Sequence, residues 1–179
     1  MIIEDHKVIF IHIPKNAGTA IETLFGNSSF KIQPDKHANI HEIKRKFPEV
    51  YDSHSKFTII RNPYDKMVSW YFYLKRNVGE KHEVVEFNEW IKDPLQFWHA
   101  DDPIHFLDPQ YTWVDETVTI LKFENLNKEL NEFFKEKIDL PVINKSNHDH
   151  YSIYYNRESL DIIHDRYKED FERYNYKKI

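Results

Sequence analysis

The stretch from residue 7 to residue 26 restricts the possible folds more than any other part of this 179-residue chain. It opens with KVIFIHI (residues 7–13), a short run rich in β-branched and aromatic residues that is typical of a buried strand. Pro14 ends the strand, because proline cannot continue a central ladder. After the loop Lys15 to Gly18, Thr19 can cap a helix that runs to about Phe25, and Gly26 stops it. The sequence predicts a strand, a tight loop and a helix in direct succession.

Strand and helix patterns alternate along the rest of the chain. Strands are predicted at residues 29–33, 56–60 and 118–123, and helices at residues 40–47, 63–76, 84–91, 125–137 and 157–173. Residues 93–109 and 151–155 are expected to be irregular. This alternation implies a parallel sheet with right-handed crossovers, so the expected fold class is α/β. No repeat or linker divides the chain, which predicts a single domain over residues 1–179.

Composition narrows the classes of function. A formal net charge of −5 argues against a dedicated nucleic-acid binder, which normally carries a basic excess. The chain has no cysteine, so disulfides, thiolate metal sites and thiol nucleophiles are excluded. The longest apolar run, residues 8–13, is too short to span a membrane and is interrupted by His12. The N-terminal residues lack the order of a signal peptide, and we expect a cytoplasmic protein without a membrane span.

The loop after the first strand is suited to an anion. A helix that begins just after a strand directs free N–H groups and the positive end of its dipole at the loop. Gly18 permits close approach of the backbone, Thr19 adds a hydroxyl and Lys15 adds a positive charge. This is not the nucleotide-kinase loop, since the lysine precedes the glycine instead of following it. An ordinary strand-to-helix turn with a surface lysine is the alternative.

A second anion-binding group follows the strand at residues 56–60. Arg61 leaves the carboxyl end of that strand, where ligands bind in open α/β sheets, and its guanidinium can grip a phosphate with two hydrogen bonds. Pro63 is placed to start the next helix. Ser69 lies two helical turns beyond Arg61, within reach of the same phosphate. The alternative is that Arg61 pairs with Asp65 and that Ser69 is incidental.

Together these motifs resemble the sulfotransferase superfamily. HIPKNAGTAIE is similar to its 5'-phosphosulfate loop, in particular that of the heparan-sulfate 2-O-sulfotransferases and their bacterial relatives, and FTIIRNPYDKMVSWY is similar to its 3'-phosphate motif. LKFENL (121–126), PVINKSN (141–147), Tyr154-Tyr155 and YKEDFERYNY (167–176) resemble later family segments. The resemblance implies a P-loop-like three-layer α/β/α fold with a central parallel sheet. It also implies transfer of a sulfuryl group from 3'-phosphoadenosine 5'-phosphosulfate (PAPS) to an acceptor hydroxyl of a carbohydrate or another molecule, without a metal.

The resemblance also implies roles for particular residues. Lys15 would be catalytic and would bind the donor with the loop, Arg61 and Ser69 would bind the 3'-phosphate, and Lys145 would lie in a loop over the nucleotide. The implied PAPS-binding residues are Lys15, Asn16, Ala17, Gly18, Thr19, Ala20, Arg61, Ser69 and Lys145. The loop NAGT is closer to bacterial members than to the animal enzymes. This chain has His148 where many relatives carry arginine or lysine.

The acceptor hydroxyl needs a general base, and histidine has a suitable pKa. His37 is the first candidate, because heparan-type enzymes place a catalytic histidine between the two donor motifs. His41 is the second candidate, and Glu22 is the third. Four other histidines, at positions 99, 105, 148 and 150, are expected to be solvated rather than to form a metal site.

Residues 80–109 are the least family-like segment and are the expected source of acceptor specificity. The aromatic residues there are expected to be mainly core, although one or two could stack on a sugar: Trp90, Phe97, Trp98 and Phe106. Two other functions stay open. A nucleotide kinase would require ATP and Mg²⁺, and a non-catalytic binding module would bind 3',5'-bisphosphoadenosine without transferring a sulfuryl group. The sequence leaves the oligomeric state open.

Overall fold

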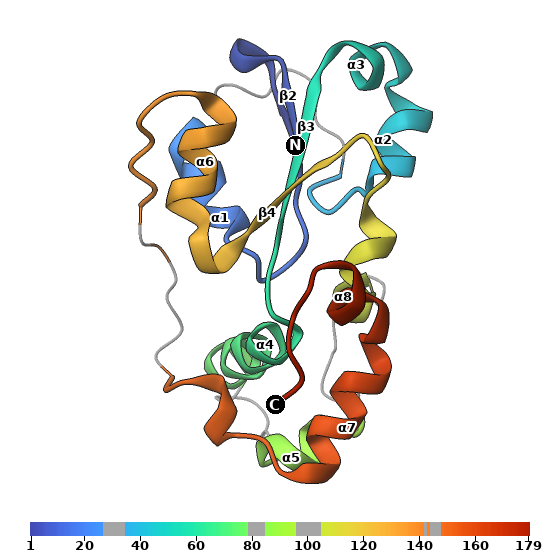
Figure 1. Ribbon diagram of the computed structural model, residues 1–179, viewed down its shortest axis with the longest axis vertical. Coiled ribbons are helices and arrows are strands. Elements are labelled where there is room, and N and C mark those ends of the chain that lie inside the picture. The colour runs from blue at the N-terminus through green and yellow to red at the C-terminus, as the bar shows by residue number, and fades with distance from the viewer. Residues whose placement is uncertain (27–34, 79–84, 96–104, 142, 144–147) are drawn as a thin grey trace. The chain divides into compact units, whose positions relative to one another are not determined.

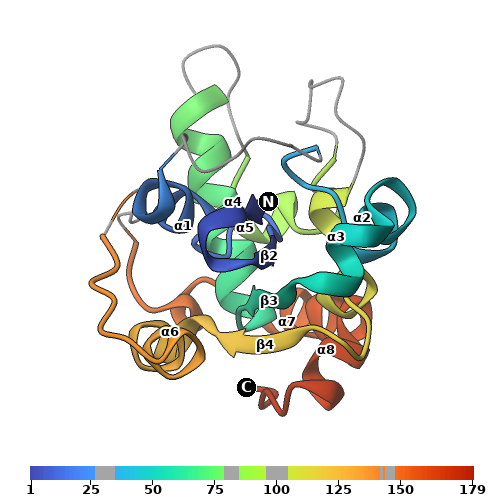
Figure 2. The same cartoon turned by 90° about the horizontal axis from the view of Figure 1, so that it is seen from above.

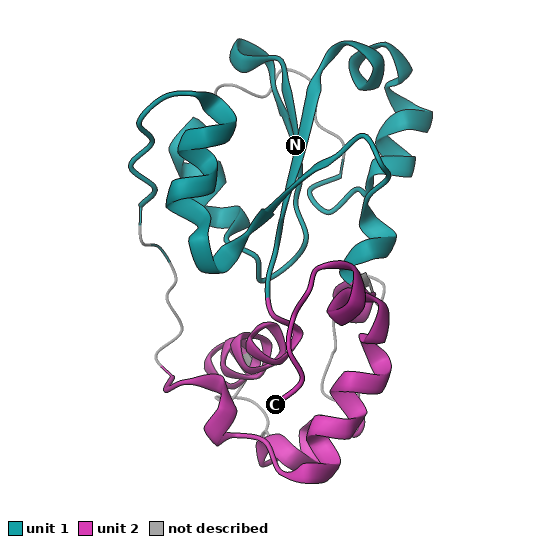
Figure 3. Ribbon diagram, viewed as in Figure 1, with its two compact units in different colours: residues 1–61, 110–144 teal, residues 62–109, 145–179 magenta. Residues whose placement is uncertain are grey.

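The computed structural model describes residues 1–26, 35–78, 85–95, 105–141, 143 and 148–179. These residues form two compact units, each made of two stretches of the chain (Figure 3). Unit 1 contains residues 1–61 and 110–144, and unit 2 contains residues 62–109 and 145–179. The boundary falls between Arg61 and Asn62, inside the second sequence motif. The expectation of a single domain stays a prediction.

Unit 1 is built on a four-stranded sheet whose strands lie in chain order: β1 (Ile2–Ile3), β2 (Val8–Ile11), β3 (Ser55–Ile60) and β4 (Thr119–Lys122). The three predicted strands β2, β3 and β4 are parallel to one another. In the register, Ile11 pairs with Thr58, and Ile60 pairs with Lys122. The short strand β1, which the sequence did not predict, pairs antiparallel with β2. The sheet is therefore mostly parallel.

Helices cover both faces of this sheet (Figures 1 and 2). Helices α1 (Gly18–Phe25) and α6 (Leu126–Phe134) lie on one face, and α2 (Ile40–Lys46) and α3 (Pro48–Ser53) lie on the other. Alternate β2 residues serve the two cores, since Phe10 packs with the first pair of helices and Ile9 with the second. Both faces of a central parallel strand must be apolar, which explains the continuous hydrophobic run that marked it in the sequence. The fold is a three-layer α/β/α arrangement.

Several predicted elements differ in detail. Helix α1 begins at Gly18 rather than after a Thr19 cap, and its N-cap Ala17 makes no side-chain capping bond. Pro48 starts α3 as well as closing α2. The predicted strand at residues 29–33 lies outside the described residues.

Two predicted helices of unit 2 also differ. The helix expected at residues 84–91 is the single turn α5 (Phe87–Trp90). The single closing helix is wrong, because the chain breaks at Tyr167 into α7 (Arg157–Arg166) and α8 (Lys168–Arg173). Tyr167 is buried and its backbone leaves helical geometry, so packing of its ring overrides a pattern that contains neither glycine nor proline.

Unit 2 is a helical assembly around α4 (Pro63–Val78). Asn62 caps α4, because its Oδ1 accepts from the Tyr64 N–H at 3.0 Å, and Pro63 occupies the first helical position as predicted. Its apolar side packs with α5, α7 and α8 in one aromatic-rich core. Short 3₁₀ turns complete the described connections: η1 (Glu4–His6), η4 (Gln110–Trp113) and η5 (Phe123–Asn125) in unit 1, and η3 (His105–Leu107) and η6 (Tyr151–Ile153) in unit 2.

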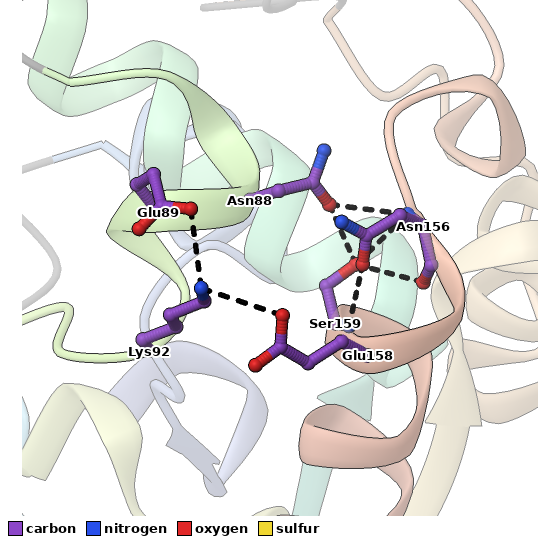
Figure 4. A network of polar contacts seen from close by, with 6 residues as sticks. All are labelled: Asn88, Glu89, Lys92, Asn156, Glu158 and Ser159. Carbon is purple, nitrogen blue, oxygen red and sulfur yellow. Dashed lines mark hydrogen bonds and ion pairs between the residues drawn. The ribbon is translucent and has the colours of Figure 1, made fainter.

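A polar network joins α5 to α7 within unit 2 (Figure 4). Asn156 and Ser159 form a capping box at the start of α7, and the Ser159 hydroxyl donates to Asn88 Oδ1 at 2.6 Å. Lys92 bridges Glu89 and Glu158 at 3.1 and 3.3 Å. Ser159 is almost fully buried, whereas the Lys92 pairs are exposed, so the amide and hydroxyl groups hold the contact more firmly than the charges do.

No helix in the described part of the chain is long and apolar enough to cross a membrane.

Candidate active site

The lysine loop and Arg61 meet at the carboxyl edge of the sheet in unit 1. Strands β2 and β3 are parallel neighbours, so the residues that follow them emerge at the same edge. There, Arg61 Nη1 donates to the carbonyl oxygen of Lys15 at 3.0 Å. The Arg61 guanidinium also lies over the Phe123 ring, with Cζ 4.2 Å from the ring centroid. The Arg61 side chain therefore lies beside the backbone of the lysine loop, although the two residues are far apart in the sequence.

The loop between β2 and α1 has an unusual backbone. Lys15 and Ala17 both have left-handed φ values, 69° and 61°, which non-glycine residues rarely adopt. Among the described residues, the backbone N–H groups of residues 16–19 have no acceptor, as expected for a loop that opens into a helix start. The Ala20 N–H differs, since it donates to the Ala17 carbonyl oxygen at 3.0 Å. The loop thus offers backbone donors, a helix dipole and a lysine to an anion.

Gly18 has a role that the sequence did not suggest. A Cβ atom at this position would lie 1.7 Å from Nε2 of His12, and the other ring atoms of His12 are nearly as close. The His12 imidazole therefore fills the space that any larger residue would need. We expected Gly18 to let a ligand approach the backbone, but the neighbour that requires a glycine here is the last polar side chain before the loop.

His12 belongs to a group of titratable side chains beside the start of α1, which we call the ionisable cluster: His12, Glu22, Lys36 and His37. Glu22 lies at its centre, with Oε1 3.3 Å from His12 Nδ1 and Oε2 3.0 Å from Lys36 Nζ. The first contact falls short of hydrogen-bond geometry. The rings of His12 and His37 are 4.6 Å apart between centroids. A carboxylate, an ammonium group and two imidazoles thus share one location.

At neutral pH, His12 and Glu22 in this cluster differ in charge. Burial lowers the pKa of His12 to about 4, so its ring is neutral. The interaction with His12, followed by that with Lys36, lowers the pKa of Glu22 to about 2, so its carboxylate is ionised. A neutral imidazole facing a carboxylate carries its proton on the facing nitrogen, here Nδ1. Because it is so weakly basic and contacts His12 and Lys36, Glu22 is poorly suited to be the general base.

His37 is held by the backbone of His12, the residue that follows β2. Its Nδ1 lies 3.1 Å from the carbonyl oxygen of His12. A carbonyl can only accept, so Nδ1 must carry the proton, and in the neutral ring the lone pair is then on Nε2. A half-buried histidine with its tautomer fixed in this way has the arrangement required of a general base. His41, the second candidate, is exposed on α2.

The opposite side of the loop is held by uncharged groups, which we call the amide frame: the side chains of Asn16 and Gln110 and the backbone of Arg61. Asn16 Nδ2 donates to the Ile59 carbonyl and to Gln110 Oε1, both at 2.7 Å. Gln110 in turn accepts from the Arg61 N–H and donates to the Arg61 carbonyl, both at 2.9 Å. Asn16 and Gln110 are completely buried. The frame fixes the lysine loop and Arg61 relative to one another.

The predicted roles of Ser69 and Lys145 stay predictions. Ser69 is buried on α4 in unit 2, and its pairing with Arg61 stays a prediction. Lys145 lies outside the described residues, as do His99, Phe97 and Trp98. His148 stacks on Phe72 and His150 caps η6. Within the described residues, no group of three or more metal-ligating side chains could hold a metal ion.

Sequence reasoning missed His12, Gln110 and Phe123 as parts of this region. His12 carried a signal, because it is a polar residue at the end of an otherwise apolar strand. Phe123 marked a strand-to-helix junction but offered no reason to be placed beneath an arginine. Gln110 carried no local signal at all, since its partners are 49 and 94 residues away.

The fold and the arrangement of the site indicate a general class of protein. A lysine loop at a helix start, with an arginine at the end of the next parallel strand, is typical of proteins that bind phosphate-like groups of a nucleotide. A family model described as "Sulfotransferase family" matches residues 1–115, more than half of the chain. The chain therefore belongs to the sulfotransferase family, whose members are enzymes that transfer sulfuryl groups. No curated protein and no solved structure matches it.

The match covers both donor motifs, His37 and the segment at residues 80–109 that looked least family-like. It ends before β4, so the resemblance at residues 121–126, 141–147 and 167–176 stays a prediction.

Proposed function

We propose that this sulfotransferase uses PAPS as its donor and a hydroxyl group of a carbohydrate as its acceptor. The observation that carries the proposal is the 3.0 Å contact between Arg61 Nη1 and the Lys15 carbonyl. It supports one binding site with two cationic side chains, which matches a donor that carries negative groups at its 5' and 3' positions. The carbohydrate acceptor rests on the similarity of HIPKNAGTAIE to the carbohydrate-type enzymes.

The donor set fits such a ligand. The backbone N–H groups of residues 16–19 and the Thr19 hydroxyl can hold the oxygens of the 5'-phosphosulfate. Lys15 adds a positive charge at the same loop. Arg61 can grip a phosphate with a pair of parallel N–H donors, and its guanidinium is held near the loop by the Lys15 carbonyl and the Phe123 ring. Ser69 and Lys145 complete the proposed 3'-phosphate site. Ala20 is the least suited of the proposed contacts, because its N–H donates within the helix.

Bound PAPS supplies an activated sulfuryl group and a bisphosphate leaving group. In the proposed in-line transfer, the acceptor oxygen forms a bond to sulfur as the bond from sulfur to the phosphate oxygen breaks. Lys15 stabilises the negative charge that the phosphate oxygen gains. His37 Nε2 takes the proton of the acceptor hydroxyl, while Nδ1–H stays on the His12 carbonyl. With lysine and backbone donors supplying the countercharge, no metal is needed.

Calorimetric titration with 3',5'-bisphosphoadenosine, with and without Mg²⁺, tests the donor site. We expect binding of equal strength in both conditions, followed by transfer from labelled PAPS to members of a carbohydrate acceptor panel. Binding of ATP only in the presence of Mg²⁺ would instead indicate a kinase. Binding of the bisphosphate without transfer to any acceptor would indicate a non-catalytic module.

A further inference from the structure

Glu22 makes contacts that neither donor binding nor proton abstraction by His37 explains. Its two carboxylate oxygens contact two different residues, and each of these residues is linked to His37. Oε1 faces the ring of His12, whose own carbonyl holds His37 Nδ1. Oε2 pairs with Lys36, the residue directly before His37. One side chain on α1 therefore contacts both the residue beneath His37 and the residue that precedes it.

The surroundings show what these contacts restrain. The His12 ring is wedged against Gly18 and stacked on Phe10, so it has little room to move. The segment that carries His37 is a tight turn, closed by the bond from the Ala38 N–H to the Asp35 carbonyl at 2.8 Å. The ion pair between Lys36 and Glu22 links this turn to α1. Without that carboxylate, Lys36 would lose its partner, and an ionised group would no longer face His12.

We infer that Glu22 is a positioning residue, which holds His37 in the orientation and tautomer needed to accept a proton at Nε2. This inference rests on the proposed function, because it assigns Glu22 a task in the same reaction. The task differs from that of a general base, since Glu22 acts through His12 and Lys36 and does not touch the acceptor. It also explains why a carboxylate that is itself a poor base stands beside the lysine loop.

The first test observes His37 directly and does not depend on turnover. In the wild-type protein, ¹⁵N spectra of the His37 ring should show a protonated Nδ1 and an unprotonated Nε2. In Glu22→Gln the segment that carries His37 loses its tie to α1, so the ring should leave the His12 carbonyl for part of the time. The two signals should then move toward one another, as the released ring exchanges between tautomers. Glu132→Gln, on the exposed surface of α6, is the matched control and should leave the His37 signals unchanged. An unaltered His37 pattern in Glu22→Gln overturns the inference.

The second test separates positioning from proton abstraction. Glu22→Gln should lower kcat about 10- to 100-fold, the range for loss of a group that orients a functional side chain, with KM for PAPS changed less than about twofold. In a His37→Ala background it should have little further effect, because there is no ring left to orient. Equal losses in both backgrounds overturn the inference. If wild type transfers no sulfuryl group, the proposed function fails, and the ¹⁵N spectra still decide the contacts of Glu22.

Discussion

The lysine loop is held by two groups of contacts, the amide frame and the ionisable cluster, which consist of different kinds of side chain. We call them the two sides of the loop. The amide frame holds the loop and Arg61 with neutral groups that are fully buried and cannot titrate. The ionisable cluster holds the other side with two imidazoles, a carboxylate and an exposed ammonium group. Neutral amides keep their geometry at every pH, which suits a site for a ligand of fixed charge. A group that must accept a proton needs titratable neighbours, so we expect the frame to govern donor binding and the cluster to govern the chemical step.

Lys15 belongs to neither group of contacts, and its replacement should have the largest effect. Lys15→Ala is expected to lower kcat about 10²- to 10³-fold, as for the loss of one group that stabilises charge in a transition state. The fold should survive, because the contact to Arg61 uses the backbone carbonyl, which alanine retains. Steady-state kinetics and thermal unfolding measure both effects. Lys128→Ala, on the exposed face of α6, is the control and should behave as wild type. Near-normal turnover of Lys15→Ala would remove the lysine from the mechanism.

Gly18→Ala should displace the His12 ring and so disturb the ionisable cluster. Its methyl group would overlap the His12 ring, so we expect a loss of about 3 kcal/mol in the free energy of unfolding. Denaturant unfolding measures it. Adding His12→Ala should restore part of the loss by opening the space. Gly26→Ala is the matched control, since Gly26 has a φ of 70° and its cost is backbone strain that His12→Ala cannot relieve. Absence of rescue at Gly18 would show that the overlap is not the cause.

The cluster side should also respond to pH, whereas the frame should not. Unfolded His12 takes up a proton near pH 6.5 and folded His12 only near pH 4, so between these values the unfolded state binds more protons. Stability is then lost as the pH falls from 6.5 to 4, by about 3 kcal/mol for this residue. Chemical unfolding across this range should show a smaller slope in His12→Asn. His41→Asn, which changes an exposed histidine, should keep the wild-type slope. Equal slopes in all three proteins would contradict the assignment.

A smaller effect is expected from breaking the frame. Gln110→Met keeps the volume of the side chain but removes the acceptor of the Arg61 N–H and one of the two acceptors of Asn16 Nδ2. We expect a loss of about 2 kcal/mol in stability and an affinity for 3',5'-bisphosphoadenosine that is roughly tenfold weaker. Calorimetry measures the affinity, and kcat at saturating PAPS should change less than the affinity does. Asn127→Met, an exposed amide on α6, is the control. A fall in kcat with unchanged affinity would reverse the roles assigned to the two sides.

The sequence predicted the elements that pack on both faces. Strands β2, β3 and β4 were recognisable because each is a short run rich in β-branched and aromatic residues, and α1 and α4 because Gly26 and Pro63 mark a helix end and a helix start. Strand β1 has only two residues and thus no periodicity. The break at Tyr167 depends on how one ring packs in unit 2, which no local pattern records.

The sequence likewise indicated only part of the candidate site. Lys15 and Arg61 could be chosen because charge and position relative to a strand end are visible in one segment at a time, whereas His37 was chosen from the family resemblance. The roles of all three residues stay predictions. The reason for Gly18 could not be predicted, since it depends on the conformation of a ring six residues earlier. The amide frame was invisible, because it exists only when strands β2 and β3 are already side by side.

The hydrogen bond from Asn16 to Gln110 spans 94 residues of chain, and this has a consequence for biosynthesis. The lysine loop is translated early, but its anchor is made only after more than half of the polypeptide has left the ribosome's catalytic centre. A nascent chain that ends before Gln110 carries the loop without its support, and the closure of such a long span is slow compared with local helix formation. Donor binding should therefore emerge late during synthesis, well after α1 and α4 have formed.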